Sequence, residues 1–283
     1  MIEPKMVQDE ASLYHSKKLL SNSGIGKLLK CPALFHAWLE GQTVDEDSPA
    51  LRLGTFFHSM TLEPQTVDVK YHFLQSPGTT KAGKEERKAA EADGLTCVTM
   101  TEALTAKSMA TAVHNQPYVG RLFTSGKLQA ETSIYWTELS SGGLEVDCKA
   151  RVDGLIHLPD GHVIAIDLKS AQSADPAELG RKVYNFGYHR QAAWYTHALA
   201  QVGVQPSAFI FVFVEKSAPW LVTPVVLTED AITLGWDECQ RAVEICAECQ
   251  QSGVWPQYSD KVISLDLPEW VYAQRMRKER NHE

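Results

Sequence analysis

The sequence predicts an α/β (α+β) protein in which a central mixed β-sheet is flanked by helices and preceded by helical N-terminal additions. Two observations predict this class. Apolar residues recur at helical spacing up to about residue 127, and from residue 128 the period changes to the alternation typical of strands. A helical pattern then separates the first strands from two later ones, as in sheets that carry helices on their faces.

Length and composition favour a single folded unit. Hydrophobic residues make up 44% of the 283 positions and charged residues 22%, which are ordinary values for a globular protein. We expect one domain over residues 1–283. Within it we expect a helical part at about 20–127, a sheet core at about 128–228, and a C-terminal helix and tail at 229–283.

Several classes of protein are disfavoured. The longest strongly apolar run, Phe209 to Val214, is too short to span a bilayer, and the N-terminus lacks the pattern of a signal peptide. We therefore expect a soluble, cytoplasmic protein without a membrane partner. The formal charge of -8 argues against indiscriminate coating of nucleic acid, but it allows an enzyme whose basic residues line one groove.

Helices are predicted throughout the N-terminal part. The first follows N-cap candidates at Ser21 to Ser23, and Cys31-Pro32 interrupts it. His58 lies on the third, which ends before Pro64. The later helices of this part are Ala33 to Glu40, Ala50 to Leu62 and residues 101–114.

The second half alternates strands with helices. Turn signals at Ser140 to Gly143 and at Pro159 to Gly161 separate three strands into consecutive hairpins. In chain order the expected elements are strands Thr132 to Glu138, Leu144 to His157 and His162 to Lys169, a helix Gly187 to Val202, strands Ser207 to Glu215 and Trp220 to Leu227, and a helix Glu229 to Gln251.

The second hairpin places two carboxylates face to face. If Pro159 to Gly161 is a three-residue loop with Gly161 left-handed, counting outward puts Asp153 directly opposite Asp167. Two like charges across a sheet destabilise it unless a cation lies between them, and Mg²⁺ or Mn²⁺ prefers such oxygens. The pairing therefore predicts a metal site.

Lys169 adds a cation to the same face. It lies two residues beyond Asp167, close enough to act on a metal-bound water or on a phosphate. Arg151 also shares the face of Asp153 and is a candidate phosphate contact. An Asp-x-Lys motif alone is weak, because Asp and Lys at a strand end are commonly its solvated rim.

Four short motifs in order strengthen the metal interpretation. They are Gly54-Thr55-Phe56-Phe57-His58, Asp153-Gly154, Asp167-Leu168-Lys169, and Gln191 with Tyr195. Together they resemble the RecB-type branch of the PD-(D/E)XK nucleases, and most closely the nuclease domain of the exodeoxyribonuclease VIII family of prophage recombination systems. The resemblance spans roughly Ser21 to Val214 and implies a restriction-endonuclease-like core.

The resemblance implies a role for each matching residue. Metal ligands are expected at His58, Asp153 and Asp167 with the backbone carbonyl of Leu168, and the catalytic lysine at Lys169. Gln191 would orient groups around the water and the scissile phosphate, supported by Tyr195. Glu131 is similar in placement to an acidic residue that assists binding of the metal or of a terminal phosphate in related exonucleases.

Some of these positions have a plainer interpretation. A histidine among phenylalanines is more often a core residue than a ligand. For His58 only the presence of Gly54 and of the two aspartates, Asp153 and Asp167, reverses this expectation. Gln191 and Tyr195 could form a packed helix face beside Trp194. Tyr188 and Arg190 are either surface residues or DNA contacts, and Tyr195 is a further candidate DNA contact.

The resemblance further implies an Mg²⁺-dependent exonuclease, with Mn²⁺ as a substitute and no organic cofactor. Such an enzyme digests double-stranded DNA from its ends, 5′ to 3′, in phage or prophage recombination. Expected partners are duplex ends, further copies in a ring-like homo-oligomer, and a single-strand annealing recombination protein. A structure-specific endonuclease and a non-catalytic DNA-binding or assembly protein remain alternatives.

The cysteines argue against an iron–sulfur cluster, which some RecB-type nucleases carry. Cys31 is early enough, but the late spacing of Cys239, Cys246 and Cys249 is unlike the usual one and falls inside a predicted helix. Because the six cysteines also lack the spacing of a disulfide framework, we expect buried, reduced thiols.

Overall fold

The computed structural model describes residues 1–43 and 48–280. The last residues of the expected C-terminal tail, 281–283, lie outside the described residues. Among the described residues, no helix is long and apolar enough to cross a membrane.

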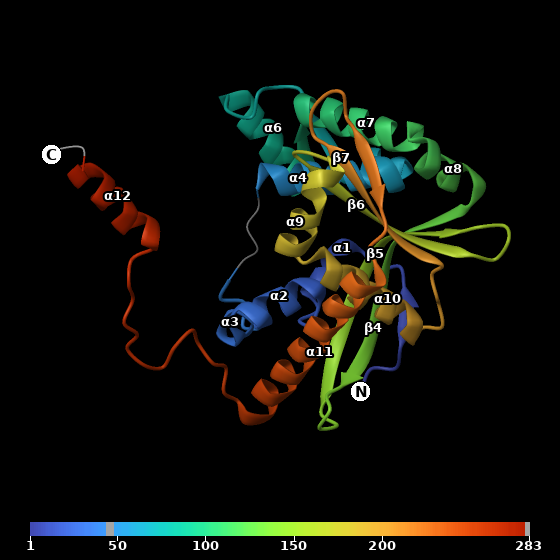
Figure 1. The fold of residues 1–283 in the computed structure, drawn as a ribbon. Coiled ribbons are helices and arrows are strands. Elements are labelled where there is room, and N and C mark those ends of the chain that lie inside the picture. The colour runs from blue at the N-terminus through green and yellow to red at the C-terminus, as the bar shows by residue number, and fades with distance from the viewer. Residues whose placement is uncertain (44–47, 281–283) are drawn as a thin grey trace.

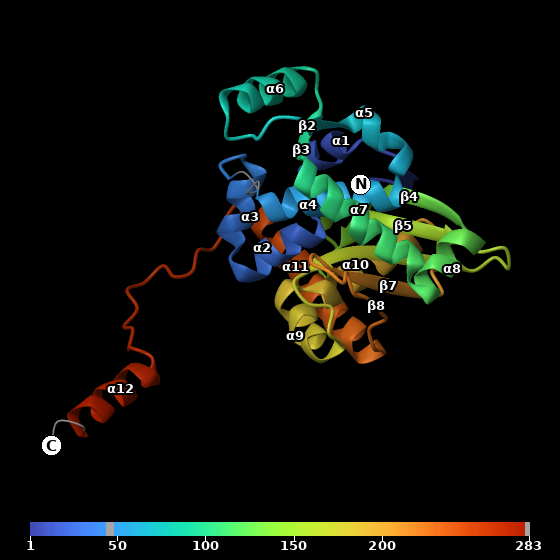
Figure 2. The same ribbon diagram turned by 90° about the horizontal axis from the view of Figure 1, so that it is seen from above.

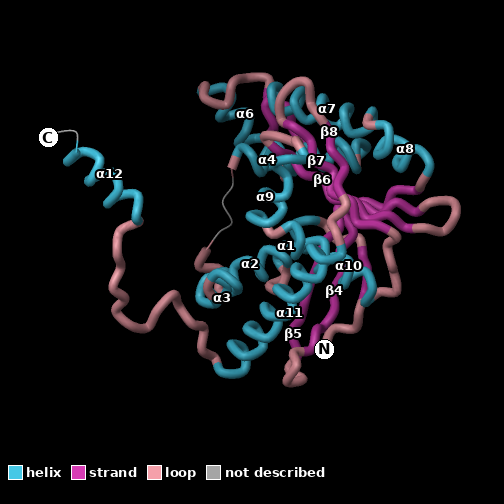
Figure 3. Tube along the Cα trace, in the orientation of Figure 1, coloured by secondary structure: helices cyan, strands magenta, loops and turns pink. Residues whose placement is uncertain are grey.

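Six strands form one mixed sheet in the order β1-β4-β5-β6-β7-β8. They gather in the middle of the molecule with helices on either side (Figure 3). Only β6 and β7 are parallel among these neighbours. The strands are β1 Lys5–Val7, β4 Lys127–Leu139, β5 Glu145–His157, β6 Val163–Ala171, β7 Ala208–Glu215 and β8 Val222–Val225.

Helices cover both faces of the sheet (Figures 1 and 2). The helices α4 (Pro49–Leu62), α7 (Met100–Asn115) and α8 (Pro117–Ser125) lie on one face. The other face carries α2 (Asn22–Lys30), α3 (Pro32–Leu39), α9 (Pro176–Phe186), α10 (Tyr188–Gln201) and α11 (Glu229–Ser252). Helices α9 and α10 form the crossover between the parallel strands, as a parallel pair requires.

Smaller elements decorate this core. A two-stranded parallel sheet of β2 and β3 packs beside α7, and the charged helix α6 packs on this small sheet. A C-terminal arm, residues 254–280, leaves the end of α11. Its Trp255 and Pro256 contact α3, and the rest of the arm projects from the body (Figure 1). The remaining bounds are α1 Ala11–Ser16, η1 Pro64–Thr66, α5 Val67–Lys70, β2 Tyr71–Leu74, α6 Lys81–Ala92, β3 Thr96–Thr99 and α12 Glu269–Arg280.

The predicted hairpin register is correct. Leu158 N donates to His162 O (2.9 Å), and Gly161 is left-handed with φ +89°. The ladder then runs outward from His157 opposite Val163. Its last printed pair is Gly154 with Ile166, so Asp153 and Asp167 are the next positions on the two strands.

The face pattern changes where this ladder ends. In β5, Val152 and Leu155 both belong to the core cluster under α10 and α11, although strict alternation would put them on opposite faces. In β4, Ala130 packs in the cluster under α4 and α7, whereas Ile134 packs in the other one. Between them lies Glu131 with φ +50°, a left-handed residue inside a strand. Its conformation accounts for the change of face in β4.

Several boundaries differ from the sequence prediction. The expected strand from Trp220 is shorter, because Trp220 itself has φ +61° and follows a proline. Pro224 within β8 is tolerated because that strand is the edge of the sheet. Pro117 begins a helix, α8, and does not merely end the preceding one, since proline suits the first turn.

Candidate active site

The candidate site lies where β5 and β6 separate, beside Glu131 of β4. By register Glu131 stands opposite Asp153, because the pairs on either side are Ala130 with Gly154 and Thr132 with Val152. Asp153 in turn stands next to Asp167 across the end of the second ladder. Three neighbouring strands therefore contribute one carboxylate each to the same level of the sheet.

Asp153 replaces backbone pairing with side-chain pairing. Its Oδ2 accepts a hydrogen bond from the backbone N–H of Leu168 (2.9 Å), just beyond the last ladder pair. The Leu168 carbonyl accepts from Nε2 of His58 (2.9 Å). Side chains thus satisfy both backbone groups of Leu168 at a point where the strands part, as buried backbone groups require.

His58 is held against Asp153 by this contact. When a neutral ring donates through Nε2, its Nδ1 carries a lone pair, and Nδ1 lies 3.3 Å from Oδ2 of Asp153. A lone pair facing a carboxylate oxygen at this distance is unfavourable unless a proton or a cation lies between them. The ring comes from α4, whose Phe56 and Phe57 are fully buried and fix the helix on the sheet.

Glu131 completes a group that fits a metal ion. Ligand atoms of His58, Glu131 and Asp153 all lie within 4.8 Å of one another, the one such group of three or more found among the described residues. One imidazole nitrogen and two carboxylates suit a divalent cation such as Mn²⁺ or Mg²⁺. A positive φ costs a residue such as Glu131 roughly 1–3 kcal/mol, and such strain clusters at functional sites.

Asp167 lies beside this group with partners of its own. Its Oδ2 accepts from Nε2 of Gln191 (2.6 Å), while Oδ1 contacts the ammonium of Lys169. Oδ1 is fully buried and accepts no hydrogen bond of normal geometry. Asp167 is the most buried of the carboxylates, at 1% side-chain exposure. An acidic oxygen buried in this way fits a further ligand position of a cation held by this group.

Aromatic rings enclose the lysine and the glutamine. The Lys169 ammonium lies 4.8 Å from the ring centre of Tyr188 and 5.8 Å from that of Phe211. Tyr195 packs edge-on against Phe209 and is a hydrogen-bond partner of Gln191. The site is therefore largely shielded from water on the α10 side, where electrostatic interactions are strong.

Burial sets the protonation of the carboxylates. It raises the pKa of Asp153 to about 7, against the opposing pull of Lys169. Burial and then the charge of Asp153 raise the pKa of Asp167 to about 7 as well. Both acids are thus poorly solvated, and a bound cation would favour their ionised forms.

The two basic groups respond in opposite ways. Burial lowers the pKa of His58, although Glu131 and Asp167 pull it upward, so the neutral imidazole needed for a ligand is favoured. For Lys169, burial lowers the pKa, but Asp167 and Asp153 more than offset this and leave it above its ordinary value. Lys169 is therefore a charged donor and not a neutral base.

Two candidate DNA contacts have structural partners. Nε of Arg151 donates to Oε2 of Glu131 (2.7 Å), and its Nη1 donates to the backbone carbonyl of Asp9 (2.8 Å). Nη1 of Arg190 pairs with Oε2 of Glu238 on α11 (2.7 Å). Arg151 thus serves the carboxylate site directly, whereas Arg190 links two helices.

The N-terminal segment beside Arg151 was not anticipated from the sequence. Asp9 and Tyr14 contact residues of β4 and β5 more than 120 positions away, and no local pattern announces such contacts. For Glu131 the only signal was the resemblance, because nothing in the strand pattern shows that its backbone departs from the β region.

The cysteines lie away from the site. All six are buried and free, and Cys239, Cys246 and Cys249 lie on α11 as expected. Burial raises the pKa of each of these three thiols. That the protein holds no iron–sulfur cluster stays a prediction.

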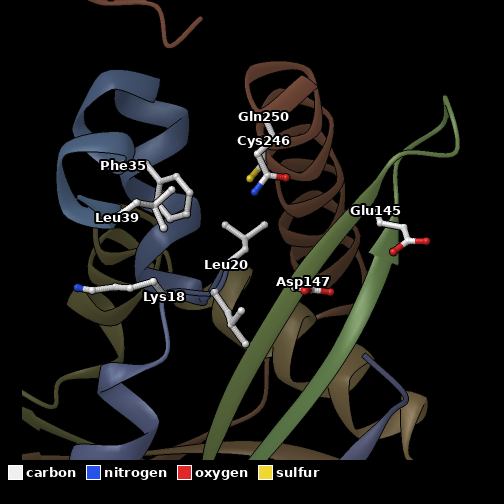
Figure 4. A pocket seen from close by; sticks show the side chains of 9 residues that line it. Lys18, Leu20, Phe35, Leu39, Glu145, Asp147, Cys246 and Gln250 are labelled. Carbon is white, nitrogen blue, oxygen red and sulfur yellow. The ribbon is translucent and has the colours of Figure 1, made fainter. Parts of the chain in front are cut away.

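Two cavities lie elsewhere in the described part of the chain. One of about 300 Å³ opens between α3, α11 and β5, lined by Phe35, Leu39, Cys246 and acidic groups of β5 (Figure 4). Another of about 380 Å³ lies between α8 and the β5–β6 turn. Neither is lined by a carboxylate of the candidate site.

Comparison with known proteins gives a family match and a solved structure of similar fold. A family described as a PDDEXK-like domain of unknown function (DUF3799) matches residues 21–268. The chain is also similar to a crystal structure from Eubacterium rectale described as a “Putative exonuclease”, with a TM-score of 0.59 and 16% identity over 93% of this chain and 97% of that one.

At such low identity this likeness shows the fold alone. A structure described as SSO0001 gives a TM-score of 0.31 at 13% identity, covering 68% of this chain and 85% of that one, and carries no argument. No curated protein matches.

Proposed function

The chain belongs to the family of PDDEXK-like domains of unknown function (DUF3799), and from this premise we propose that it is a divalent-metal-dependent deoxyribonuclease. The predicted fold class, a PD-(D/E)XK core with a mixed sheet flanked by helices, is confirmed by the family and the structural match. The observation that carries the proposal is the group of His58, Glu131 and Asp153 directly beside Asp167 and Lys169.

The side chains suit phosphodiester hydrolysis. His58, Glu131, Asp153 and Asp167 would hold the cation, which supplies a Lewis acid and lowers the pKa of a bound water. The charged Lys169 would donate to a phosphoryl oxygen and stabilise the negative charge that develops there. The Leu168 carbonyl, which accepts from His58, retains a second lone pair for the cation.

Gln191 and Tyr195 act behind these groups. Gln191 fixes the rotamer of Asp167 through its 2.6 Å hydrogen bond, and Tyr195 holds the amide of Gln191. Such outer partners keep a metal ligand oriented and are commonly worth about 10- to 100-fold in affinity or activity. Tyr188 keeps Lys169 directed toward Asp167.

Within nucleases we propose an exonuclease that uses Mg²⁺ and degrades duplex DNA from its ends. Support comes from the order of the sequence motifs and from the description of the Eubacterium rectale structure. The 5′ to 3′ direction, a ring-like homo-oligomer, an annealing protein as partner and a role in phage recombination are parts of this proposal that rest on the sequence resemblance.

The experiment compares linear with closed circular duplex DNA in the presence of Mg²⁺. We expect nucleotide release from the linear substrate alone, abolished in Asp167→Ala. Cutting of the circle would replace the exonuclease with a structure-specific endonuclease. Absence of metal-dependent cleavage on both substrates would overturn the nuclease and favour a DNA-binding protein with this fold.

A further inference from the structure

Arg151 is placed to control Glu131. The two side chains form an ion pair in which Nε of Arg151 lies 2.7 Å from Oε2 of Glu131, and the arginine is only 14% exposed. Its Nη1 also reaches Oγ of Ser133 (3.3 Å). A guanidinium is a rigid, planar group of donors. When hydrogen bonds hold one of its nitrogens, the directions in which the other nitrogens donate are therefore fixed as well.

The second anchor of this fork comes from the N-terminal segment, residues 1–20. Nη1 of Arg151 donates to the backbone carbonyl of Asp9 (2.8 Å). The Asp9 carboxylate is itself tied down, by Nζ of Lys17 (2.6 Å) and by the hydroxyl of Tyr135. The guanidinium also lies over the ring of Tyr14, with its carbon 5.7 Å from the ring centre. Arg151 is thus clamped by a segment that precedes the family match, which begins at residue 21.

A buried lysine secures the same segment. Nζ of Lys149 donates to the backbone carbonyls of Tyr14 (2.8 Å) and Lys17 (2.6 Å) at the end of α1. Lys149 is only 2% exposed. Two successive charged residues on one face of β5, Lys149 and Arg151, therefore bind the N-terminal segment to the strand that carries Asp153.

Glu131 needs such support more than the other ligands do. Its φ of +50° is unfavourable, and such a conformation persists only when its surroundings over-determine it. The carboxylate also lies close to Asp153, which repels it. Arg151 opposes both effects, because it neutralises one charge and holds the carboxylate within reach of His58.

We propose that Arg151 is a positioning residue that, clamped by the N-terminal segment, sets the carboxylate of Glu131 for metal binding, and that it does not contact DNA phosphate. This inference rests on the proposed metal site but not on cleavage itself. It makes residues 1–20 part of the working site, although they hold none of its ligands.

The test is a double-mutant cycle between Arg151 and Glu131. The variants are Arg151→Met, Glu131→Gln and both together, and the readouts are Mn²⁺ affinity measured by calorimetry without DNA, and kcat and KM on linear duplex DNA. We expect Arg151→Met to weaken Mn²⁺ binding by about 10- to 100-fold and to lower kcat with little change in KM. In the Glu131→Gln background the same substitution should have almost no further effect.

A matched control separates positioning from the loss of any ion pair. Lys182 also donates to one carboxylate, Glu178 (3.1 Å), and to one backbone carbonyl, Ser173 (2.7 Å), and is 24% exposed. Lys182→Met should leave Mn²⁺ affinity unchanged. Arg151→Lys keeps the charge without the fork and should give an intermediate affinity. If Arg151→Met fails to fold, as thermal unfolding would show, the same cycle is built with Arg151→Lys.

Additive effects of the two substitutions on Mn²⁺ affinity would overturn the inference. A change confined to the KM for DNA would also overturn it, and would make Arg151 a phosphate contact. Failure of the proposed function looks different. In that case the wild type cleaves no DNA while the coupling in Mn²⁺ affinity persists. Conversely, if the wild type cleaves DNA but Arg151 and Glu131 show no coupling in Mn²⁺ affinity, the positioning role is excluded and the proposed nuclease function stands.

Discussion

Strand β5 is built differently on the two sides of Asp153. From Gly154 to His157 it pairs with both β4 and β6, and Leu155 and Ile156 pack into apolar clusters on its two faces. From Glu145 to Val152 it pairs with β4 but with no residue of β6, and one of its faces carries charged residues. One part of this strand therefore contributes mainly to the stability of the sheet and the other carries charged side chains, and the carboxylates of the candidate site lie at the boundary between them.

Removing a carboxylate at the boundary should have the largest effect. In Asp167→Asn we expect cleavage to fall by more than about 100-fold, because even the outer partners of a metal ligand are worth 10- to 100-fold. Above pH 7 the metal-free variant should nevertheless unfold at a higher temperature than the wild type. The raised pKa of Asp167 means that its ionised form destabilises the fold, and Lys169 keeps Asp153 as a counter-charge. Nucleotide release and thermal unfolding in EDTA measure the two effects. A lower melting temperature would mean that Asp167 stabilises the metal-free fold.

The same boundary should make stability depend on pH. The carboxyl groups of Asp153 and Asp167 have pKa values raised from 3.8 to about 7, so between these values the folded state holds more protons than the unfolded state. The free energy of unfolding of the metal-free protein should therefore fall as pH rises through this window. Denaturant unfolding of the wild type is compared with that of an Asp153→Asn, Asp167→Asn double variant. Equal pH slopes in the two proteins would contradict the prediction.

Gly154 marks the start of the apolar side. A Cβ there would lie 2.8 Å from Cγ1 of Ile166 and 3.0 Å from Cδ1 of Leu128, closer than packing allows. We expect Gly154→Ala to destabilise the protein by about 1–3 kcal/mol, as overpacking does, in urea unfolding. Gly180→Ala, where the added Cβ has no neighbour within 4 Å, is the control. Equal stability of the two variants would show that β5 and β6 can move apart.

We expect the smallest effect from a substitution at Ile156, within the apolar part of β5. Ile156 is fully buried, and Ile156→Val should cost about 0.5–1.5 kcal/mol of unfolding free energy. Mn²⁺ affinity should not change, because the methyl group is removed from the core cluster and not from the site. If Ile156→Val lowered the free energy of metal binding as much as that of unfolding, stability and metal binding would not be separated along β5.

The hairpin was predictable because its determinants are local. A three-residue turn ending at Gly161 fixes the register, and the register alone places Asp153 beside Asp167. Helix α4 was predicted to within one residue of its start, and it carries His58. That His58 meets Leu168, 110 positions away, came only from the resemblance, since no periodicity specifies a contact between a helix and a distant strand.

Other elements were missed for different reasons. Strand β1 has three residues, too few to show a period. Helix α9 was not predicted, although its sequence carries a cap at Asp175, a proline at its first position and Gly187 after its end. The left-handed Glu131 could not be foreseen, because its conformation depends on Arg151 and on a segment that lies far away in the sequence.

The burial of all six thiols has a practical consequence for following the C-terminal arm. Thiol-reactive dyes attack the thiolate, and burial both hides these sulfurs and, for the three on α11, raises their pKa. A cysteine introduced at an exposed arm position such as Tyr258 would then react far faster than the native ones. The natural protein thus offers a silent background for fluorescence or spin labels, without prior removal of its own cysteines.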